Sequence, residues 1–163
     1  MSSPVPGAAT GIALGQTAPD FTLRDQFGQD VTLASYRGQK AVAIVFYPYA
    51  FSGVCSGEMS VFRQRLDEFL TFDTELLAVS CDPVYALRAF SDSDGLNFAL
   101  LSDFWPHGQV ARAYGVLDER VGCPERSSYV IDKDGRLTWA VHHPKADARD
   151  ADALLTALRA AAE

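Results

Sequence analysis

The stretch that decides the fold is Phe46-Tyr47-Pro48-Tyr49-Ala50-Phe51-Ser52-Gly53-Val54-Cys55-Ser56-Gly57-Glu58. It joins two strongly patterned elements. Residues 41–47 form a continuous apolar run rich in β-branched side chains, which is typical of a strand buried on both faces. Over residues 59–70, apolar residues recur at helical spacing with charged residues between them, which predicts an amphipathic helix. The sequence therefore predicts a strand, a tight connection and a helix.

Cys55 falls at the predicted start of this helix. Pro48 ends the strand because it has no N–H for the ladder, and Ser52 or Gly53 is suited to cap the helix. The first turn of a helix has unpaired N–H groups and the positive end of the macrodipole, which both favour a thiolate over a thiol. Because the thiolate is the nucleophile, this position indicates a reactive cysteine. The alternative is a structural cysteine buried among apolar neighbours.

The length, charge and cysteine count exclude several classes of protein. A chain of 163 residues can form one domain whose core needs no disulfide support. We expect a flexible leader at residues 1–13 and a folded domain at residues 14–163. The net charge of −7 argues against nucleic acid or a membrane surface as a partner, and no apolar run reaches the length of a membrane span. Three cysteines without C-x-x-C fit a reducing compartment, so we expect a cytoplasmic protein.

The remaining elements follow in an order that is typical of an α/β fold. We expect an N-terminal β-hairpin over 18–23 and 30–33, a strand at 75–80, a helix at 84–91, an extended stretch at 97–101, a helix at 109–114, a β-hairpin over 127–131 and 137–142, and a helix at 151–162. This order predicts a mixed central sheet flanked by helices. Cys55 then lies at the carboxyl end of the first central strand, where open α/β sheets place their ligand sites.

A family resemblance rests on Pro48, Ser52 and Cys55, which form the pattern P-x-x-x-S-x-x-C between a strand and a helix. This pattern resembles the P-x-x-x-[ST]-x-x-C signature of the peroxiredoxins, which are thiol peroxidases with a thioredoxin-like fold. The stretch from Tyr47 to Glu58 is most similar to the AhpE type, which uses one cysteine. The resemblance implies a thiol-dependent peroxidase that reduces hydrogen peroxide and organic hydroperoxides. Cys55 would be the peroxidatic cysteine and would cycle through a sulfenic acid.

The resemblance also implies roles for residues near Cys55. Peroxide reduction needs donors fixed on both oxygens of the O–O bond. Ser52 is expected to place a hydroxyl beside the sulfur, and Pro48 to shield the thiolate from water. Arg126 is the expected cation beside the sulfur, and Glu58 is the expected partner that orients this arginine. The alternatives are an ordinary loop arginine and a carboxylate that serves only the helix start.

Three further side chains, Tyr49, Phe51 and Val54, could line the mouth of the site, although each could equally be ordinary packing. Cys81 and Cys123 are candidates to resolve the sulfenic acid, which departs from the one-cysteine pattern of the AhpE type. Cys123 belongs to a segment, residues 121–126, that looks like a flexible loop. The alternative is an external reductant, either a low-molecular-weight thiol or a protein of the thioredoxin or glutaredoxin kind.

The partners that we expect are a hydroperoxide substrate, a thiol reductant and a second copy of the chain. The homodimer is implied by the aromatic loop at residues 103–108, because this region lies near the subunit interface of the relatives. We expect no cofactor, and the scattered histidines and cysteines do not have the spacing of a zinc site.

Three other functions compete with the peroxidase. A redox sensor or thiol-regulated interaction protein would use the same oxidation of Cys55 with slow turnover. A Cys–His hydrolase needs a histidine held beside the cysteine, and none of the three histidines has a clear relation to Cys55. A disulfide oxidoreductase needs the C-x-x-C motif, which the sequence lacks.

Overall fold

The structure, a computed structural model, describes residues 12–143 and 149–163. Its strands are β1 (Thr22–Arg24), β2 (Asp30–Thr32), β3 (Ala41–Phe46), β4 (Thr74–Ser80), β5 (Ala99–Ser102), β6 (Leu117–Asp118), β7 (Cys123–Pro124), β8 (Ser127–Ile131) and β9 (Leu137–His142). Its helices are η1 (Leu33–Tyr36), α1 (Gly53–Gln64), α2 (Leu66–Phe69), α3 (Val84–Asp94), α4 (Gln109–Ala113) and α5 (Ala151–Ala161). These elements confirm the mixed α/β fold with an N-terminal β-hairpin.

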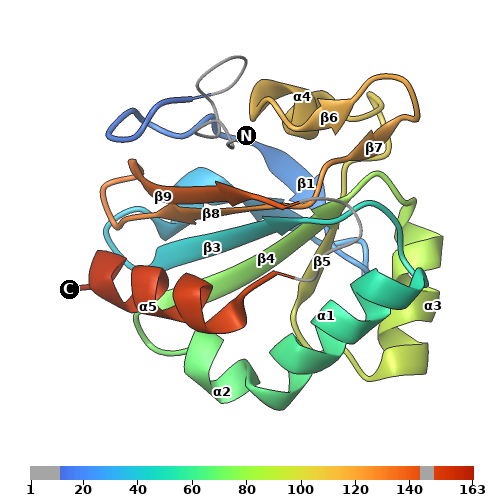
Figure 1. Cartoon of the computed structure of the whole chain (residues 1–163), viewed down its shortest axis with the longest axis horizontal. Helices are drawn as coiled ribbons and strands as arrows, with labels where there is room; N and C mark the ends of the chain where they lie inside the picture. Colours follow the sequence, from blue (N-terminus) through green and yellow to red (C-terminus); the bar gives the residue numbers. More distant parts are fainter. Residues whose placement is uncertain (1–11, 144–148) are drawn as a thin grey trace.

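The central sheet has seven strands in the order β2-β1-β5-β4-β3-β8-β9 (Figure 1). Strand β3 lies between β4, to which it is parallel, and β8, to which it is antiparallel. All six residues of β3 are buried, as its unbroken apolar run predicts. The parallel pairing brings the carboxyl ends of β3 and β4 to the same edge of the sheet.

Each face of the sheet supports its own core, because successive side chains of a strand point to opposite faces. From β3, Ala43 and Val45 pack into a core with α1, α2, α3 and α5. Ile44 and Phe46 pack on the other face, with α4 and the N-terminal segment. Figure 1 shows the same division, with α4 on the upper side of the sheet and α1, α2 and α5 on the lower side. The two cores hold the end of β3 from both sides.

The sequence predicts one continuous helix that ends at residue 70. This prediction is wrong, because the structure has two separate helices, α1 and α2, in this region. The backbone leaves the helical conformation at Arg65, which has φ −111° and ψ 22° and separates α1 from α2. The Arg65 guanidinium donates to Glu68 at 2.8 Å and to Asp152 of α5 at 2.6 Å. Because Asp152 is distant in the sequence, no local pattern reveals the contact that holds this bend.

Strands β6 and β7 form a small antiparallel hairpin that the sequence does not predict. The expected flexible loop at residues 121–126 contains β7, and Cys123 is only 1% exposed. The hairpin is fastened to the loop after β5, because the His107 ring nitrogen Nε2 lies 2.6 Å from the Gly122 carbonyl oxygen. A strand of two residues is too short to leave a periodic signal in the sequence.

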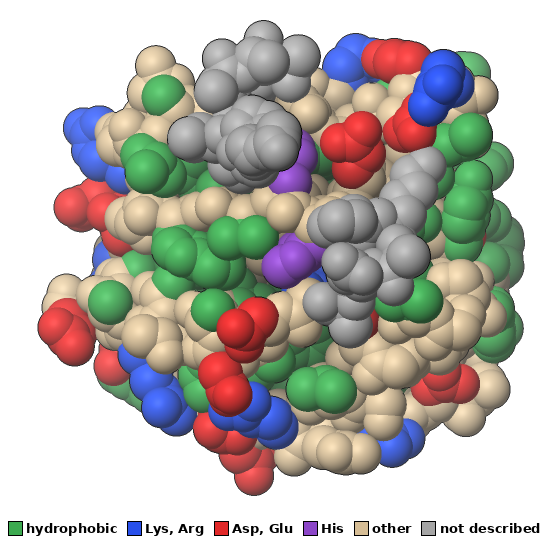
Figure 2. All heavy atoms as spheres, viewed as in Figure 1, with side chains coloured by type: hydrophobic (Ala, Val, Ile, Leu, Met, Phe, Trp, Pro, Cys, Tyr) green, Lys and Arg blue, Asp and Glu red, His purple; other side chains and the backbone are tan. Residues whose placement is uncertain are grey.

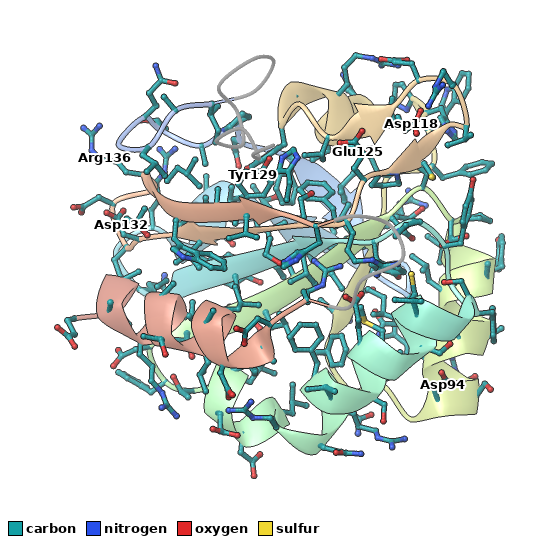
Figure 3. The ribbon with its side chains drawn as sticks, viewed as in Figure 1. Asp94, Asp118, Glu125, Tyr129, Asp132 and Arg136 are labelled. Carbon is teal, nitrogen blue, oxygen red and sulfur yellow. The ribbon has the colours of Figure 1, made fainter. Side chains whose placement is uncertain are left out.

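Tyr129, labelled in Figure 3, connects the sheet to the segment that carries this hairpin. Its hydroxyl donates to the carbonyl oxygen of Tyr114, directly after α4, at 3.0 Å. The Tyr114 hydroxyl in turn donates to the Pro19 carbonyl oxygen at 2.7 Å. Both rings lie in the core against Phe46. These contacts fix α4, and with it the chain that runs through β6 and β7, over the end of β3.

The predicted leader lies mostly outside the described residues, and within it Ile12 packs into the core below α4. No helix in residues 12–143 or 149–163 is both long enough and apolar enough to span a bilayer.

Candidate active site

The turn between β3 and α1 is held by a carboxylate from the neighbouring strand end. Asp82 follows β4, and its Oδ2 accepts the Ala50 N–H at 2.8 Å and the Ser80 hydroxyl at 2.8 Å. The contact is possible because the parallel strands β3 and β4 end at the same edge of the sheet. The sequence motifs did not identify Asp82 as a site residue. Its position directly after a predicted strand was the feature that could have identified it.

Ser52 is the N-cap of α1, which settles the choice between Ser52 and Gly53. Its hydroxyl oxygen accepts the backbone N–H of Cys55 at 3.4 Å. Phe51, just before the cap, has a φ of +69°, in the left-handed region that a bulky residue rarely adopts. Its ring packs on Phe90 of α3 with the centroids 5.0 Å apart, which helps to hold this strained turn.

Cys55 lies in the first turn of α1 with its thiol buried beside a guanidinium. The Nη2 of Arg126, just before β8, lies 3.5 Å from the Cys55 sulfur. Both side chains are almost fully buried, at 0% and 2% exposed. Away from water a charge acts more strongly on its neighbours, so the guanidinium interacts strongly with the sulfur of Cys55.

Glu58, one turn after Cys55 on α1, binds the same arginine. Its Oε1 pairs with Nη1 of Arg126, and the carboxylate is 4% exposed. The structure therefore brings together Ser52, Cys55, Glu58 and Arg126, which are the central residues of the site that the sequence predicts.

Arg149, just before α5, is a fifth residue of this cluster and was missed from the sequence. Its backbone N–H donates to Glu58 Oε2 at 2.7 Å, and its guanidinium contacts both oxygens of Glu58 at 3.2 Å. The guanidinium also donates to the carbonyl oxygens of Phe46 and Ser127, each at 2.7 Å, and to the Ser128 hydroxyl at 3.0 Å. It thus joins β3, β8 and α1. No local pattern marks Arg149, because all of its partners are distant in the sequence.

The cluster carries more positive than negative charge among its described residues. Arg126 and Arg149 carry two positive charges, and Glu58 carries one negative charge. Burial lowers the pKa of Arg149 from its ordinary value, while the nearby Glu58 acts in the opposite direction. An unbalanced charge is costly away from water, so the excess positive charge of these described side chains favours an anion bound beside them.

The mouth of the site is a hollow of about 340 Å³, lined by Pro48, Tyr49, Ser52, Gly53, Val54, Val121, Cys123 and Arg126. Two of the three predicted mouth residues, Tyr49 and Val54, belong to this lining, whereas Phe51 packs on α3. In Figure 2, hydrophobic side chains gather along the right-hand edge, over the end of the molecule where α1 begins in Figure 1. Peroxide could reach Arg126 through this apolar hollow.

The two remaining cysteines differ in their relation to the hollow. Cys123 belongs to the lining, and Cys81 does not appear among the described residues that form it. Burial, together with the charge of Asp103, raises the pKa of Cys81 to about 12. Cys81 is therefore a thiol at neutral pH and a weak nucleophile.

Replacing Arg149 with lysine should destabilise the protein although the positive charge remains. Lysine cannot reproduce the planar fork that binds Glu58, Phe46 and Ser127 together. We expect the free energy of unfolding in urea to fall by about 1 to 3 kcal/mol, the usual cost of leaving a buried acceptor without its hydrogen bond. Arg159→Lys, on the exposed face of α5, is the matched control and should change stability by less than about 1 kcal/mol. Equal stability of both variants would contradict the structural role of Arg149.

The sequence of this chain is similar to those of known proteins. Residues 14–140 match the AhpC/TSA family. Alkyl hydroperoxide reductase E of Mycobacterium tuberculosis is 45% identical over 139 residues, which cover 85% of this chain and 91% of that protein. Peroxiredoxin 2 of Thermoplasma acidophilum is 33% identical over 153 residues, which cover 90% of this chain and 75% of that protein.

Solved structures of peroxiredoxins are also similar to this chain. The crystal structure of peroxidoxin BcpB from Mycobacterium tuberculosis superposes with a TM-score of 0.79 at 32% identity, covering 90% of this chain and 96% of that one. A reduced 2-Cys peroxiredoxin from Plasmodium vivax superposes with a TM-score of 0.81 at 27% identity, covering 90% and 80%. The likeness in sequence and in fold extends over the strands, the Cys55 turn and the Arg126 segment, and the chain therefore belongs to the AhpC/TSA family of peroxiredoxins.

Proposed function

We propose that the chain is a thiol-dependent peroxidase in which Cys55 is the peroxidatic cysteine and Arg126, Ser52 and Pro48 complete the catalytic site. The observation that carries this proposal is the Arg126 guanidinium, placed 3.5 Å from the Cys55 sulfur and held there by Glu58. Arg126 also lines the hollow through which a small molecule can approach. A fixed cation therefore lies between the nucleophile and the entrance.

The reaction begins with attack of the Cys55 thiolate on one oxygen of the peroxide. A sulfur–oxygen bond forms, the O–O bond breaks, and its electron pair leaves on the other oxygen, which takes a proton and becomes water or an alcohol. Negative charge moves from sulfur to oxygen during this step, so donors already fixed around both atoms lower the barrier. The products are a sulfenic acid on Cys55 and a reduced peroxide.

Three residues supply the surroundings that this step needs. Arg126 can donate toward the sulfur and toward a peroxide oxygen in the hollow. The Ser52 oxygen already accepts from the Cys55 N–H, so its own proton is available for the peroxide. Pro48 forms part of the wall beside the thiolate and has no N–H that would hold water there.

The side chains around the mouth of the hollow determine which peroxides can enter. Tyr49 and Val54 are partly exposed and give the hollow an apolar wall, which accepts organic hydroperoxides as well as hydrogen peroxide. The sulfenic acid returns to the thiol with two equivalents of an external thiol, either a small molecule or a redox protein of the thioredoxin or glutaredoxin kind. The first thiol forms a mixed disulfide with Cys55 and releases water, and the second releases Cys55 as the thiol and leaves the reductant as its disulfide. The three cysteines are free, so the proposal places the reaction in the reducing cytoplasm.

Replacing Cys55 with serine should abolish peroxide reduction, because a hydroxyl at this position is not ionised at neutral pH and is a poor nucleophile toward oxygen. We would measure peroxide consumption with dithiothreitol as the thiol donor. Ser60→Ala, farther along α1, is the control and should keep the wild-type rate. Peroxide consumption by the Cys55→Ser variant at the wild-type rate would refute the assignment. Oxidation of wild-type Cys55 without sustained turnover would instead favour a redox sensor.

Replacing Arg126 with alanine should slow the reaction of Cys55 with peroxide by about a hundredfold, which is typical for the loss of one preorganised donor. Stopped-flow measurement of the single-turnover rate tests this expectation. Arg120→Ala is the control because its side chain is 92% exposed and belongs to the same connecting segment. A near-normal rate in Arg126→Ala would show that another cation activates the thiol.

The proposal includes a homodimer. Four exposed aromatic side chains surround a hollow of about 990 Å³ beside β1 and α3, namely Phe27, Tyr85, Phe104 and Trp105. A cluster of exposed aromatic residues marks an interaction surface. Arg24 and Asp30 also line this hollow, so a two-fold axis could place the cation of one copy beside the carboxylate of the other. Within one chain these two side chains lie 3.9 Å apart and are largely exposed, so they are available to exchange partners with a second copy.

Replacing Trp105 with aspartate should weaken the dimer, because Trp105 is 81% exposed in the chain and a buried charge would oppose association. We expect the dimer dissociation constant, measured by sedimentation, to rise by about tenfold or more. Phe72→Asp is the matched control, since Phe72 is 92% exposed but lies in the turn before β4, outside this hollow. A monomeric wild type, or equal effects of both substitutions, would exclude this surface as the dimer contact.

A further inference from the structure

We propose that Cys123 is the resolving cysteine, which attacks the sulfenic acid of Cys55 and forms a disulfide within the same chain. This inference rests on the proposed function, since it requires that peroxide oxidises Cys55. It goes further because it names the group that receives the oxidation and leaves Cys81 outside the reaction.

The first observation is the shared hollow. Cys123 lies in β7, three residues before Arg126, and both residues line the hollow together with Ser52. Arg126 also contacts the Cys55 sulfur directly. Arg126 therefore borders both the hollow that Cys123 lines and the sulfur of Cys55. Although Cys123 is almost inaccessible from outside, it borders the space in which peroxide reacts.

The second observation is the contact between Cys123 and Tyr49. The Tyr49 hydroxyl lies 3.4 Å from the Val121 carbonyl oxygen, and hydrogen bonding with Cys123 raises the pKa of Tyr49 to about 12. The hydroxyl therefore keeps its proton at neutral pH and can donate it to the sulfur when Cys123 ionises. Tyr49 thus acts as a positioning residue for the attacking thiolate.

The third observation separates the two cysteine candidates. Cys81 follows β4, and burial keeps it in the thiol form, with a pKa of about 12. Only a thiolate attacks a sulfenic sulfur efficiently. Cys81 also has no place among the described residues that line the hollow. It therefore serves as a same-residue comparison for Cys123.

The disulfide requires Cys55 to move, because its sulfur is fully buried behind Arg126. The first turn of α1 is suited to this movement. Gly53 and Gly57 flank Cys55, and neither glycine has a packed neighbour where a side chain would be. The turn also depends on a long cap bond of 3.4 Å from Ser52 and on the strained φ of Phe51. Unwinding this turn would release strain and carry the sulfur toward the hollow.

The reaction balances without a further oxidant. The Cys123 thiolate attacks the Cys55 sulfur, a sulfur–sulfur bond forms, and the sulfur–oxygen bond of the sulfenic acid breaks. Hydroxide leaves and combines with the proton that Cys123 released, giving water. Two thiol equivalents from an external reductant then reduce the disulfide and restore both cysteines.

The test oxidises fully reduced protein with an equimolar amount of hydrogen peroxide in the presence of a sulfenic-acid trap. Intact mass and peptide mapping follow under non-reducing, denaturing conditions. The wild type and Cys81→Ser should each lose two hydrogens and give a peptide that links Cys55 to Cys123. Cys123→Ser should instead accumulate the trapped sulfenic acid, by about tenfold over wild type, because the neighbouring thiol that outcompetes the trap is missing.

The outcomes distinguish this inference from the proposed function. Equal trapping of Cys55 in the wild type and in Cys123→Ser would overturn the resolving role but leave the peroxidase intact. A link from Cys55 to Cys81, or a disulfide between two chains, would also overturn it. Absence of any oxidation at Cys55 in all three proteins would refute the proposed function itself.

A second variant tests Tyr49 apart from any effect on folding. In Tyr49→Phe the disulfide should still form, but the pH at which its rate reaches half of the maximum should move upward, because the thiolate of Cys123 has lost a donor. An unchanged pH profile would exclude Tyr49 as the positioning residue.

Discussion

The site depends on one buried carboxylate, that of Glu58. It lies between two guanidiniums that come from different parts of the chain, Arg126 before β8 and Arg149 before α5. Two buried cations without a counter-charge would repel each other and would be costly to remove from water. The negative charge of Glu58 offsets part of the cost of burying the two guanidiniums. Glu58 lies one turn after Cys55 on the same helix. The position of the Arg126 guanidinium is therefore tied to the helix that carries Cys55.

The cluster also explains why the sheet is organised around β3. Arg149 binds the carbonyl oxygen of Phe46, the last residue of β3, and that of Ser127, the first residue of β8. Phe46 and Ser127 face each other across the antiparallel pair. The guanidinium thus satisfies backbone groups where the two strands begin to separate, and this separation makes room for Cys55 and Arg126 beyond the strand ends. Stability and site geometry depend on the same contacts.

Those parts of the fold and site that follow from local pattern could be predicted from the sequence. The apolar run of β3, the cap at Ser52 and the reactive position of Cys55 each depend on neighbours within a few residues. Arg126 and Glu58 were found through a family motif rather than through physical reasoning. Arg149, Asp82, the bend at Arg65 and the β6–β7 hairpin were missed. Each depends on contacts between distant segments, which periodicity and spacing do not encode.

The division of the site into a rigid part and a strained part suits the two reactions that we propose for Cys55. Arg126 is held by Glu58, which Arg149 anchors to β3 and β8, so the cation does not depend on Cys55 for its position. The chain around Cys55 is different, because it combines a left-handed Phe51 and a long cap bond before the cysteine with a glycine on either side of it. Such a turn can open while the charge cluster stays in place. The same cation can then receive the returning thiolate after reduction, so that the site need not be rebuilt in each cycle.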